Sequence, residues 1–269
     1  MNRIFIDDIA DPRIEPYRNV RDPIMRRDRG KFMAESKQIV LRMFAAGLRA
    51  ESVLTDEKRA DELAAVVPAD VPHYVITEEK MREMAGFAIH TGTLAIGFRP
   101  PEVSLAQIME AAKPQAAGQS LLLLCEKLKE PVNTGSMVRV AAAMGATALV
   151  LGPESCDPFY RRAIRVSMGS VFKQPIVRST DLLTDVRMLQ QKYSVHCVAT
   201  VLADDAIPLP GFRLKLPGAL LLGHEVDGLS RELIDAADSR VTLPMARGTD
   251  SLNVAVSAAV FAYHLTHVR

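Results

Sequence analysis

Residues 120–152 read SLLLLCEKLKEPVNTGSMVRVAAAMGATALVLG, and this stretch decides the fold class. Its two apolar runs, at residues 120–128 and 146–152, are typical of short strands that are buried on both faces. Between them, Gly135–Met144 is predicted to form a helix. Short apolar strands separated by helices indicate a mostly parallel sheet that is covered on both sides. We therefore predict an α/β fold.

The same alternation extends in both directions from this stretch. Toward the C-terminus, further strands are predicted at residues 195–203, 218–223 and 240–245, and helices near residues 159–168, 181–193, 229–237 and 251–264. Toward the N-terminus, a smaller α/β unit is predicted, with one helix over residues 30–47, strands at 50–55, 73–77 and 91–98, and helices near 56–65 and 78–86.

A segment rich in proline and glycine divides the two parts. Residues 99–119 have weak periodicity and are predicted to form a linker with one helical turn inside. The predicted domains are therefore residues 1–98, a small α/β domain, and residues 120–269, a larger α/β domain.

Composition excludes several classes of protein. With 48% hydrophobic and 24% charged residues, the chain has the balance of a globular protein rather than a disordered one. No apolar run approaches the ~20 residues that span a bilayer, and acidic residues interrupt the N-terminal stretch where a signal peptide would be apolar. We expect a cytoplasmic protein. Cys125, Cys156 and Cys197 are scattered, so we predict buried apolar side chains and no metal site.

Basic residues gather in two stretches although the net charge is only +1. Residues 18–31 and 158–180 are rich in arginine, and the second stretch contains no acidic residue. Such surfaces are compatible with a polyanion such as RNA, and the alternative is a solvated helix face. The candidate RNA-binding residues are Arg26, Arg27, Arg29, Lys31, Arg161, Arg162 and Arg165.

Three polar clusters follow strands of the predicted parallel sheet, where ligands of such sheets bind. In the first, NTGSMVR, Asn133 is a candidate helix N-cap or site residue, and Gly135 permits close approach to the backbone. Arg139 lies one helical turn beyond Gly135, in a helix that otherwise looks buried. A buried charge needs a partner, which an interface or an active site supplies.

The second cluster, LLLGHEVDGLS, brackets His224 and Glu225 with glycines at the end of an apolar strand. His224 is either a simple loop histidine or a site residue, and Glu225 is a candidate hydrogen-bond acceptor. The third cluster, LPMARGTDSLNVAV, places Asn253 in a run of small residues that looks buried. A buried amide without partners costs about 1–3 kcal/mol, so Asn253 is expected to have fixed polar neighbours.

Common nucleotide and hydrolase motifs do not occur in the sequence. It contains no GxGxxG fingerprint after the early strand, no GxxxxGK[ST] phosphate loop and no GxSxG turn. Dehydrogenases of the NAD type and P-loop NTPases are therefore unsupported. Periodicity and spacing alone indicate an α/β enzyme that binds a small ligand.

Taken together, the three clusters resemble the motifs of the SpoU, or TrmH, branch of the SPOUT RNA methyltransferases. The resemblance covers Ser120 to the C-terminus in order and spacing. Residues 30–47, ESVLT and HTGTLAIG are similar to the small ribosomal-protein-like domain with which many of these enzymes bind RNA. Two motif positions depart from the family: His224 stands where Asn or a small residue is usual, and Arg247 precedes Gly248 where the glycine is expected.

The resemblance implies an S-adenosylmethionine-dependent 2′-O-ribose methyltransferase that acts on RNA, ribosomal rather than transfer RNA, and not on DNA or at a membrane. It also implies a deep trefoil knot and a homodimer. By motif match, the implied catalytic residues are Asn133, Arg139, Glu225, Ser251 and Asn253, and the implied cofactor-binding residues are Gly223, Leu243, Met245 and Leu252. The alternatives are a tRNA 2′-O-methyltransferase, a non-catalytic RNA-binding or ribosome-assembly protein on the same scaffold, and a metabolite enzyme unrelated to nucleic acid.

Overall fold

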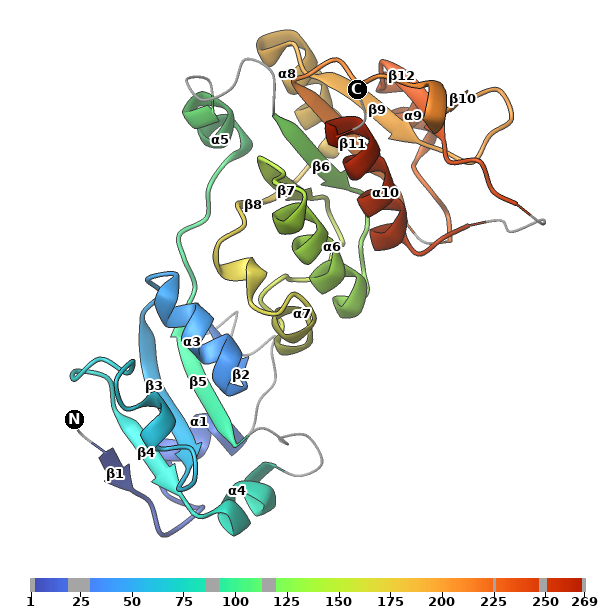
Figure 1. Ribbon diagram of the computed structural model, residues 1–269. Helices are drawn as coiled ribbons and strands as arrows, with labels where there is room; N and C mark the ends of the chain where they lie inside the picture. Colours follow the sequence, from blue (N-terminus) through green and yellow to red (C-terminus); the bar gives the residue numbers. More distant parts are fainter. Residues whose placement is uncertain are drawn as a thin grey trace. The chain divides into compact units, whose positions relative to one another are not determined.

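The computed structural model describes residues 3–18, 30–85, 92–112, 120–224, 226–246 and 251–267. The chain forms two compact units (Figure 1). Unit 1 comprises Met1–Pro101 together with Phe159–Lys173, and unit 2 comprises Glu102–Pro158 together with Gln174–Arg269. No helix among the described residues is long and apolar enough to cross a bilayer.

Unit 1 is built on a mixed five-stranded sheet in the order β1-β4-β3-β5-β2. Its strands are β1 (Arg3–Phe5), β2 (Lys31–Glu35), β3 (Ala50–Asp56), β4 (His73–Ile76) and β5 (Thr93–Phe98). β5 runs antiparallel to β2 and β3, whereas β1, β3 and β4 are mutually parallel. A core cluster that includes Leu54, Leu94 and Ile96 packs beneath Tyr17, whose hydroxyl forms a 2.7 Å hydrogen bond with Ser52.

The helices of unit 1 are short. Among the described residues they are α1 (Glu15–Arg18), α3 (Lys37–Ala45), α4 (Glu78–Ala85) and α7 (Arg161–Val166), with 3₁₀ turns η1 (Pro12–Ile14), η2 (Asp61–Leu63) and η3 (Ser170–Phe172). The predicted helix near residues 56–65 is wrong, because only the η2 turn forms there. The Asp56 carboxylate accepts the Arg59 amide at 3.0 Å, a local bond that competes with a continuous helix.

The single helix predicted over residues 30–47 is also wrong. Residues Lys31–Glu35 form β2, which pairs with β5 and buries Phe32, Met33 and Ala34. Ser36 then takes a positive φ of 90°, and α3 begins at Lys37. Phe32 fits a helical stripe as well as a strand, so sequence periodicity could not separate the two structures there.

Unit 2 contains a seven-stranded, entirely parallel sheet in the order β10-β12-β9-β11-β6-β7-β8. The strands are β6 (Leu121–Cys125), β7 (Ala148–Leu151), β8 (Ile176–Arg178), β9 (His196–Thr200), β10 (Ile207–Pro208), β11 (Gly218–Leu222) and β12 (Ser239–Thr242). Helices α5 (Leu105–Ala112), α6 (Pro131–Ala143), α8 (Leu182–Tyr193), α9 (Arg231–Ala236) and α10 (Val254–His267) and the η4 turn (Leu209–Gly211) accompany it. The predicted α/β class with a mostly parallel sheet is confirmed.

The buried strands of unit 2 explain why its sequence is so apolar. Every residue of β6, β7 and β11 is buried. All three predicted buried cysteines are buried as well. In the segment predicted as a linker, α5 forms eight residues of helix, and its Leu105 and Met109 join the core cluster of unit 2.

Residues 159–173 lie between β7 and β8 in the sequence but pack within unit 1. The ring of Phe32 on β2 lies 5.2 Å from the ring of Phe159 and 5.4 Å from that of Phe172, between centroids. Ala163 and Ile164 of α7 are fully buried. The chain therefore passes from one unit to the other three times, after residues 101, 158 and 173.

Candidate functional site

A cavity of about 530 Å³ opens in unit 2 at the carboxyl ends of β9, β11 and β12. Its walls come from segments that follow these strands and from the start of α10. Five predicted site residues line it: Gly223, Leu243, Met245, Ser251 and Leu252. The carboxyl edge of a parallel sheet is the place where such folds bind ligands. The cofactor-binding residues predicted from the sequence therefore share one cavity.

Gly223 shapes one wall of this cavity. The backbones of His224 and Gly228 exchange two hydrogen bonds of 3.0 Å, so Gly228 lies beside His224. A Cβ atom at Gly223 would lie 2.2 Å from the carbonyl carbon of Gly228 and 2.3 Å from the backbone nitrogen of Leu229. These neighbours are backbone atoms that cannot swing aside, so only glycine fits at position 223.

His224 lines the cavity beside Gly223. Its Nδ1 lies 3.1 Å from a carboxylate oxygen of Asp227, and its side chain is 18% exposed. The imidazole is thus held by its own loop while it contributes to the cavity wall. Both interpretations of His224 that the sequence allowed, a loop histidine and a site residue, are compatible with this placement.

Asn133 and Asn253 meet although 120 positions separate them in the chain. The Asn253 side-chain amide donates to Asn133 Oδ1 at 2.9 Å. Asn253 Oδ1 accepts the Ala255 amide at 3.0 Å, and its carbonyl accepts the Ser257 amide at 2.9 Å, so Asn253 is the N-cap of α10. The first and third sequence clusters are therefore joined by one hydrogen bond.

Three expectations about these side chains are corrected. Asn133 is not a helix N-cap, because α6 begins at Pro131 and Glu130 occupies the cap position. Asn253 is exposed rather than buried, because it precedes α10 instead of lying inside it. Arg139 is exposed in the single chain, because α6 turns Met137, Val138 and Ala141 toward the interior and Arg139 away from it.

Some predicted residues lie outside the described part of the chain. These are Glu225 of the catalytic set, Arg26, Arg27 and Arg29 of the RNA-binding set, and the motif departures Arg247 and Gly248.

The remaining RNA-binding candidates lie in unit 1, and most have an acidic neighbour. Lys31 Nζ lies 2.5 Å from a carboxylate oxygen of Glu51. Arg161 and Arg165 lie 3.8 and 4.0 Å from the carboxylate of Glu35, which is only 3% exposed. Arg162, between them on α7, is exposed. Sequence reasoning missed Glu35, and its only signal was an acid at the end of the apolar run FMAE.

Comparison with known proteins places this site in a family. The model of the SpoU rRNA methylase family matches residues 120–263. The chain belongs to the SpoU rRNA methylase family. The match spans all three polar clusters, and it confirms the resemblance drawn from them. As a member of this family, the protein is an RNA methyltransferase.

Individual relatives cover both units. An uncharacterized tRNA/rRNA methyltransferase of Mycobacterium tuberculosis is 33% identical and aligns over 96% of this chain and 90% of its own length. The 23S rRNA (guanosine-2′-O-)-methyltransferase RlmB of Ralstonia nicotianae is 30% identical over 80% of this chain and 84% of its own. The crystal structure of an AdoMet-bound rRNA methyltransferase from Sinorhizobium meliloti has the same fold, with a TM-score of 0.80, 22% identity and 97% of each chain covered.

Proposed function

We propose that this SpoU-family protein methylates the 2′-hydroxyl of a ribose in ribosomal RNA and takes the methyl group from S-adenosylmethionine. The observation that carries the proposal is that the second and third family motifs line one cavity, while the Asn133–Asn253 hydrogen bond joins the first motif to the third. Relatives named for guanosine 2′-O-methylation of 23S rRNA support ribosomal RNA as the substrate. The expected compartment is the cytoplasm, where ribosomes work.

The cavity fits the cofactor. Its volume lies within the range of about 300–1,000 Å³ that is typical of small-molecule sites. Leu243, Met245 and Leu252 supply apolar surface for an adenine ring, and Gly223 lets the loop at residues 224–228 close one wall. When bound, S-adenosylmethionine supplies an electrophilic methyl group on a positively charged sulfur.

The protein's own residues then have to position the ribose. Arginine stays protonated in proteins, so Arg139 is assigned to orient the phosphate and the 2′-hydroxyl rather than to remove a proton. Ser251 and Asn253 present polar groups at the start of α10, and Glu225 completes the set by motif match. Correct placement of the hydroxyl beside the methyl donor accounts for much of the expected rate enhancement.

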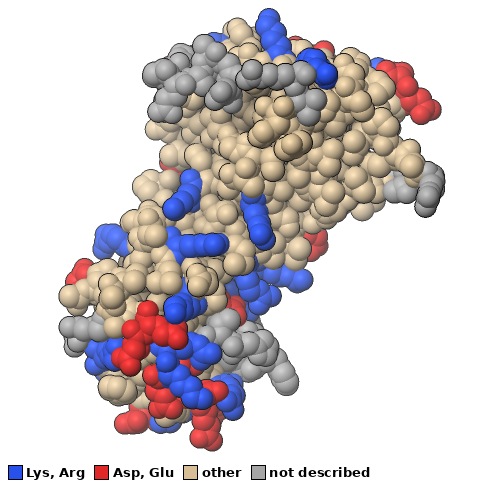
Figure 2. Space-filling view, viewed as in Figure 1, with Lys and Arg blue, Asp and Glu red and all other residues tan. Residues whose placement is uncertain are grey.

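A homodimer is part of the proposal. On α10, Val256, Val260 and Tyr263 are spaced to lie on one helical face, and they are 49%, 39% and 55% exposed. Figure 2, drawn from the same side as Figure 1, shows mostly uncharged surface over α6 and α10. Packing of this face against a second copy would cover the apolar stripe and supply neighbours for Arg139. The trefoil knot that the family resemblance implies stays a prediction.

The test is methyl transfer from tritiated S-adenosylmethionine to ribosomal RNA from a strain that lacks the gene. We expect incorporation at one ribose, which mapping of 2′-O-methyl groups would locate and which should be missing from that strain. Label in transfer RNA alone would support the tRNA alternative. RNA binding without incorporation, and without calorimetric binding of the cofactor, would support the non-catalytic alternative.

A further inference from the structure

A partly buried aromatic ring lies among positive charges on unit 1. Phe98, at the end of β5, is the register partner of Lys31 on β2, and its amide donates to the carbonyl of Arg49 at 2.9 Å. Lys31 Nζ lies 5.3 Å from the centroid of the Phe98 ring, and Arg49 Cζ lies 5.5 Å from it. Both distances are within the range of cation–π attraction.

The two cations over Phe98 differ in their exposure and in whether an ion pair holds them. The Lys31 side chain is 12% exposed and forms its 2.5 Å ion pair with Glu51. Arg49 is exposed, and no ion pair joins it to another residue in the described ranges. Arg99, next in the chain after Phe98, donates from Nε to the Lys31 carbonyl at 3.1 Å and lies 5.1 Å from the Phe159 ring. Two cations therefore lie over the Phe98 ring, and of these two only Lys31 is ion-paired within the described ranges.

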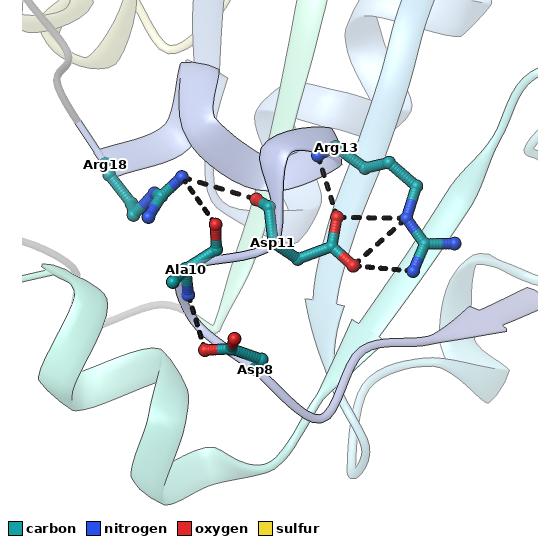
Figure 3. Close-up of polar contacts among 5 residues, drawn as sticks. All are labelled: Asp8, Ala10, Asp11, Arg13 and Arg18. Carbon is teal, nitrogen blue, oxygen red and sulfur yellow. Dashed lines mark hydrogen bonds and ion pairs between the residues drawn. The ribbon is translucent and has the colours of Figure 1, made fainter.

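Arg13, in the same unit, is an example of an arginine whose charge is paired with a carboxylate. The guanidinium of Arg13 faces the carboxylate of Asp11 with contacts of 2.6–3.1 Å, and Arg18 donates to the backbone carbonyls of Ala10 and Asp11 (Figure 3). The Arg13 hydrogen bond lowers the pKa of Asp11 to about 2, so this pair stays ionised and internally satisfied. No acid of the described residues pairs with Arg49 in this way, which leaves its charge available to an external anion.

A partly buried aromatic ring beside two cations matches the chemistry of an unpaired nucleotide. Bases of single-stranded RNA stack on aromatic side chains, whereas bases inside a duplex present no free face. Arginine and lysine bind the adjoining phosphates. A base that stacks on Phe98 would displace the exposed Arg49 from the ring, and the freed guanidinium would then contact the phosphate.

We propose that Phe98, with Arg49 and Lys31, forms a subsite for an unpaired nucleotide of RNA, in which the base stacks on the Phe98 ring and Arg49 binds its phosphate. The proposal rests on the proposed function only in taking the RNA to be the methylation substrate. It extends the predicted RNA-binding set by two residues, Phe98 and Arg49, that sequence reasoning did not single out.

The first test compares Phe98→Leu with Phe5→Leu in the full-length protein. Phe5 on β1 is 69% exposed, and no cation of the described part of the chain lies over its ring, so it is the matched control. Filter binding with an RNA hairpin that carries an unpaired loop should show roughly 5- to 150-fold weaker binding for Phe98→Leu, the range expected for one lost stack, and no change for Phe5→Leu. Phe98→Trp keeps an aromatic face and should bind at least as tightly as the wild type. Equal binding by Phe98→Leu and Phe5→Leu, or loss of binding in Phe98→Trp with unchanged melting temperature, would overturn the proposal.

The second test concerns the phosphate. Arg49→Ala should reduce the slope of log affinity against log salt by about 0.7, the value for one lost contact to a single strand, and Arg13→Ala should leave it unchanged. A fully paired RNA should be insensitive to Phe98→Leu. If the wild type binds RNA through Phe98 but transfers no methyl group, the proposed function fails and the subsite stands. If methyl transfer proceeds with an unchanged KM and kcat in Phe98→Leu, the subsite fails and the proposed function stands.

Discussion

At the scale of single residues, the site depends on close backbone approach and on two asparagines. Gly223 is fixed by atoms of Gly228 and Leu229 that leave no room for a side chain. Asn253 serves both α10, as its N-cap, and Asn133, as a hydrogen-bond donor. These roles have different energetic consequences, so substitutions can separate them.

Gly223→Ala is expected to abolish cofactor binding. The new Cβ would force the loop at residues 224–228 away from the cavity wall, since its nearest neighbours are backbone atoms at 2.2 and 2.3 Å. Isothermal calorimetry with S-adenosylmethionine measures the effect. Gly211→Ala is the matched control, because a Cβ there meets nothing within 4 Å and the backbone requires no positive φ. Cofactor binding of Gly223→Ala at the wild-type affinity would contradict this assignment.

Asn133→Ala and Asn253→Ala should differ in stability but not in activity. Both remove the 2.9 Å side-chain bond, so both should reduce methyl transfer. Only Asn253→Ala also removes an N-cap, which costs about 1 kcal/mol, or about 2–4 °C in Tm for a chain of this size. Thermal melting and tritiated-methyl incorporation measure the two effects. Full turnover by Asn133→Ala would show that the pair is only structural.

His73 should make unit 1 sensitive to acid. It is 1% exposed, its Nε2 bonds the Thr55 hydroxyl at 2.9 Å, and its Nδ1 has no partner in the described structure. Burial, with a smaller contribution from Arg3, lowers the pKa of His73 below its ordinary 6.5. The unfolded chain therefore binds the proton more readily, and stability should fall as pH drops below about 6.5. Urea midpoints at about pH 8 and about pH 5 should differ less in His73→Gln than in the wild type. An identical pH dependence in the two proteins would refute this role.

At the scale of helices and strands, continuous apolar runs predicted where the buried strands lie. The pattern of small residues within the helices did not predict which face is exposed. The long buried strands of unit 2 were all predictable, because their sequences are continuously apolar. The edge strands β1, β8 and β10 have three residues or fewer, which is too short for a periodic signal. The motifs grouped residues that line one cavity, but small apolar neighbours could not tell which side of α6 or α10 faces solvent. Asn253, and Arg139 within a single chain, were therefore wrongly expected to be buried, whereas burial of Arg139 across a subunit interface stays a prediction.

The exposed face of α10 gives a test at this scale. Val260→Asp should disrupt the proposed homodimer, because a carboxylate would be desolvated in the interface. Sedimentation should show the wild type near twice the 29.5 kDa chain mass and the variant near the chain mass. Val66→Asp is the matched control, since Val66 is 37% exposed and Val260 is 39% exposed. A wild type that sediments as a monomer and still methylates RNA would exclude the dimer.

At the scale of the whole molecule, the two units are not continuous segments of the chain, because residues 159–173 pack in unit 1. Two domains joined only by the predicted linker at residues 99–119 would allow the first domain to be removed while cofactor binding and dimerisation stayed intact. However, Phe159 and Phe172, which follow β7 in the chain, pack on Phe32 of β2. Removal of unit 1 residues therefore uncovers apolar side chains on the part that remains.

Deletion of residues 1–98 is thus expected to produce an aggregating protein. Phe172, Ala163 and Ile164 are buried in the intact chain and would face solvent. Light scattering during purification would detect the aggregates. Deletion combined with Phe159→Ser and Phe172→Ser should be more soluble, which would tie the defect to this segment. A soluble, cofactor-binding deletion without further substitutions would contradict the expectation.

The late position of residues 159–173 also affects the order of events during synthesis. β5, the last strand of unit 1 along the chain, leaves the ribosome about 60 positions ahead of Phe159, an interval of roughly 3–12 s at about 5–20 residues per second. For that time the nascent small unit has its strands but lacks the aromatic cover of Phe32. An edge strand left open in this way is a site of mispairing between neighbouring chains on a polysome. Chaperone binding to nascent chains of this protein is therefore expected to end only once the second half of the chain has been translated.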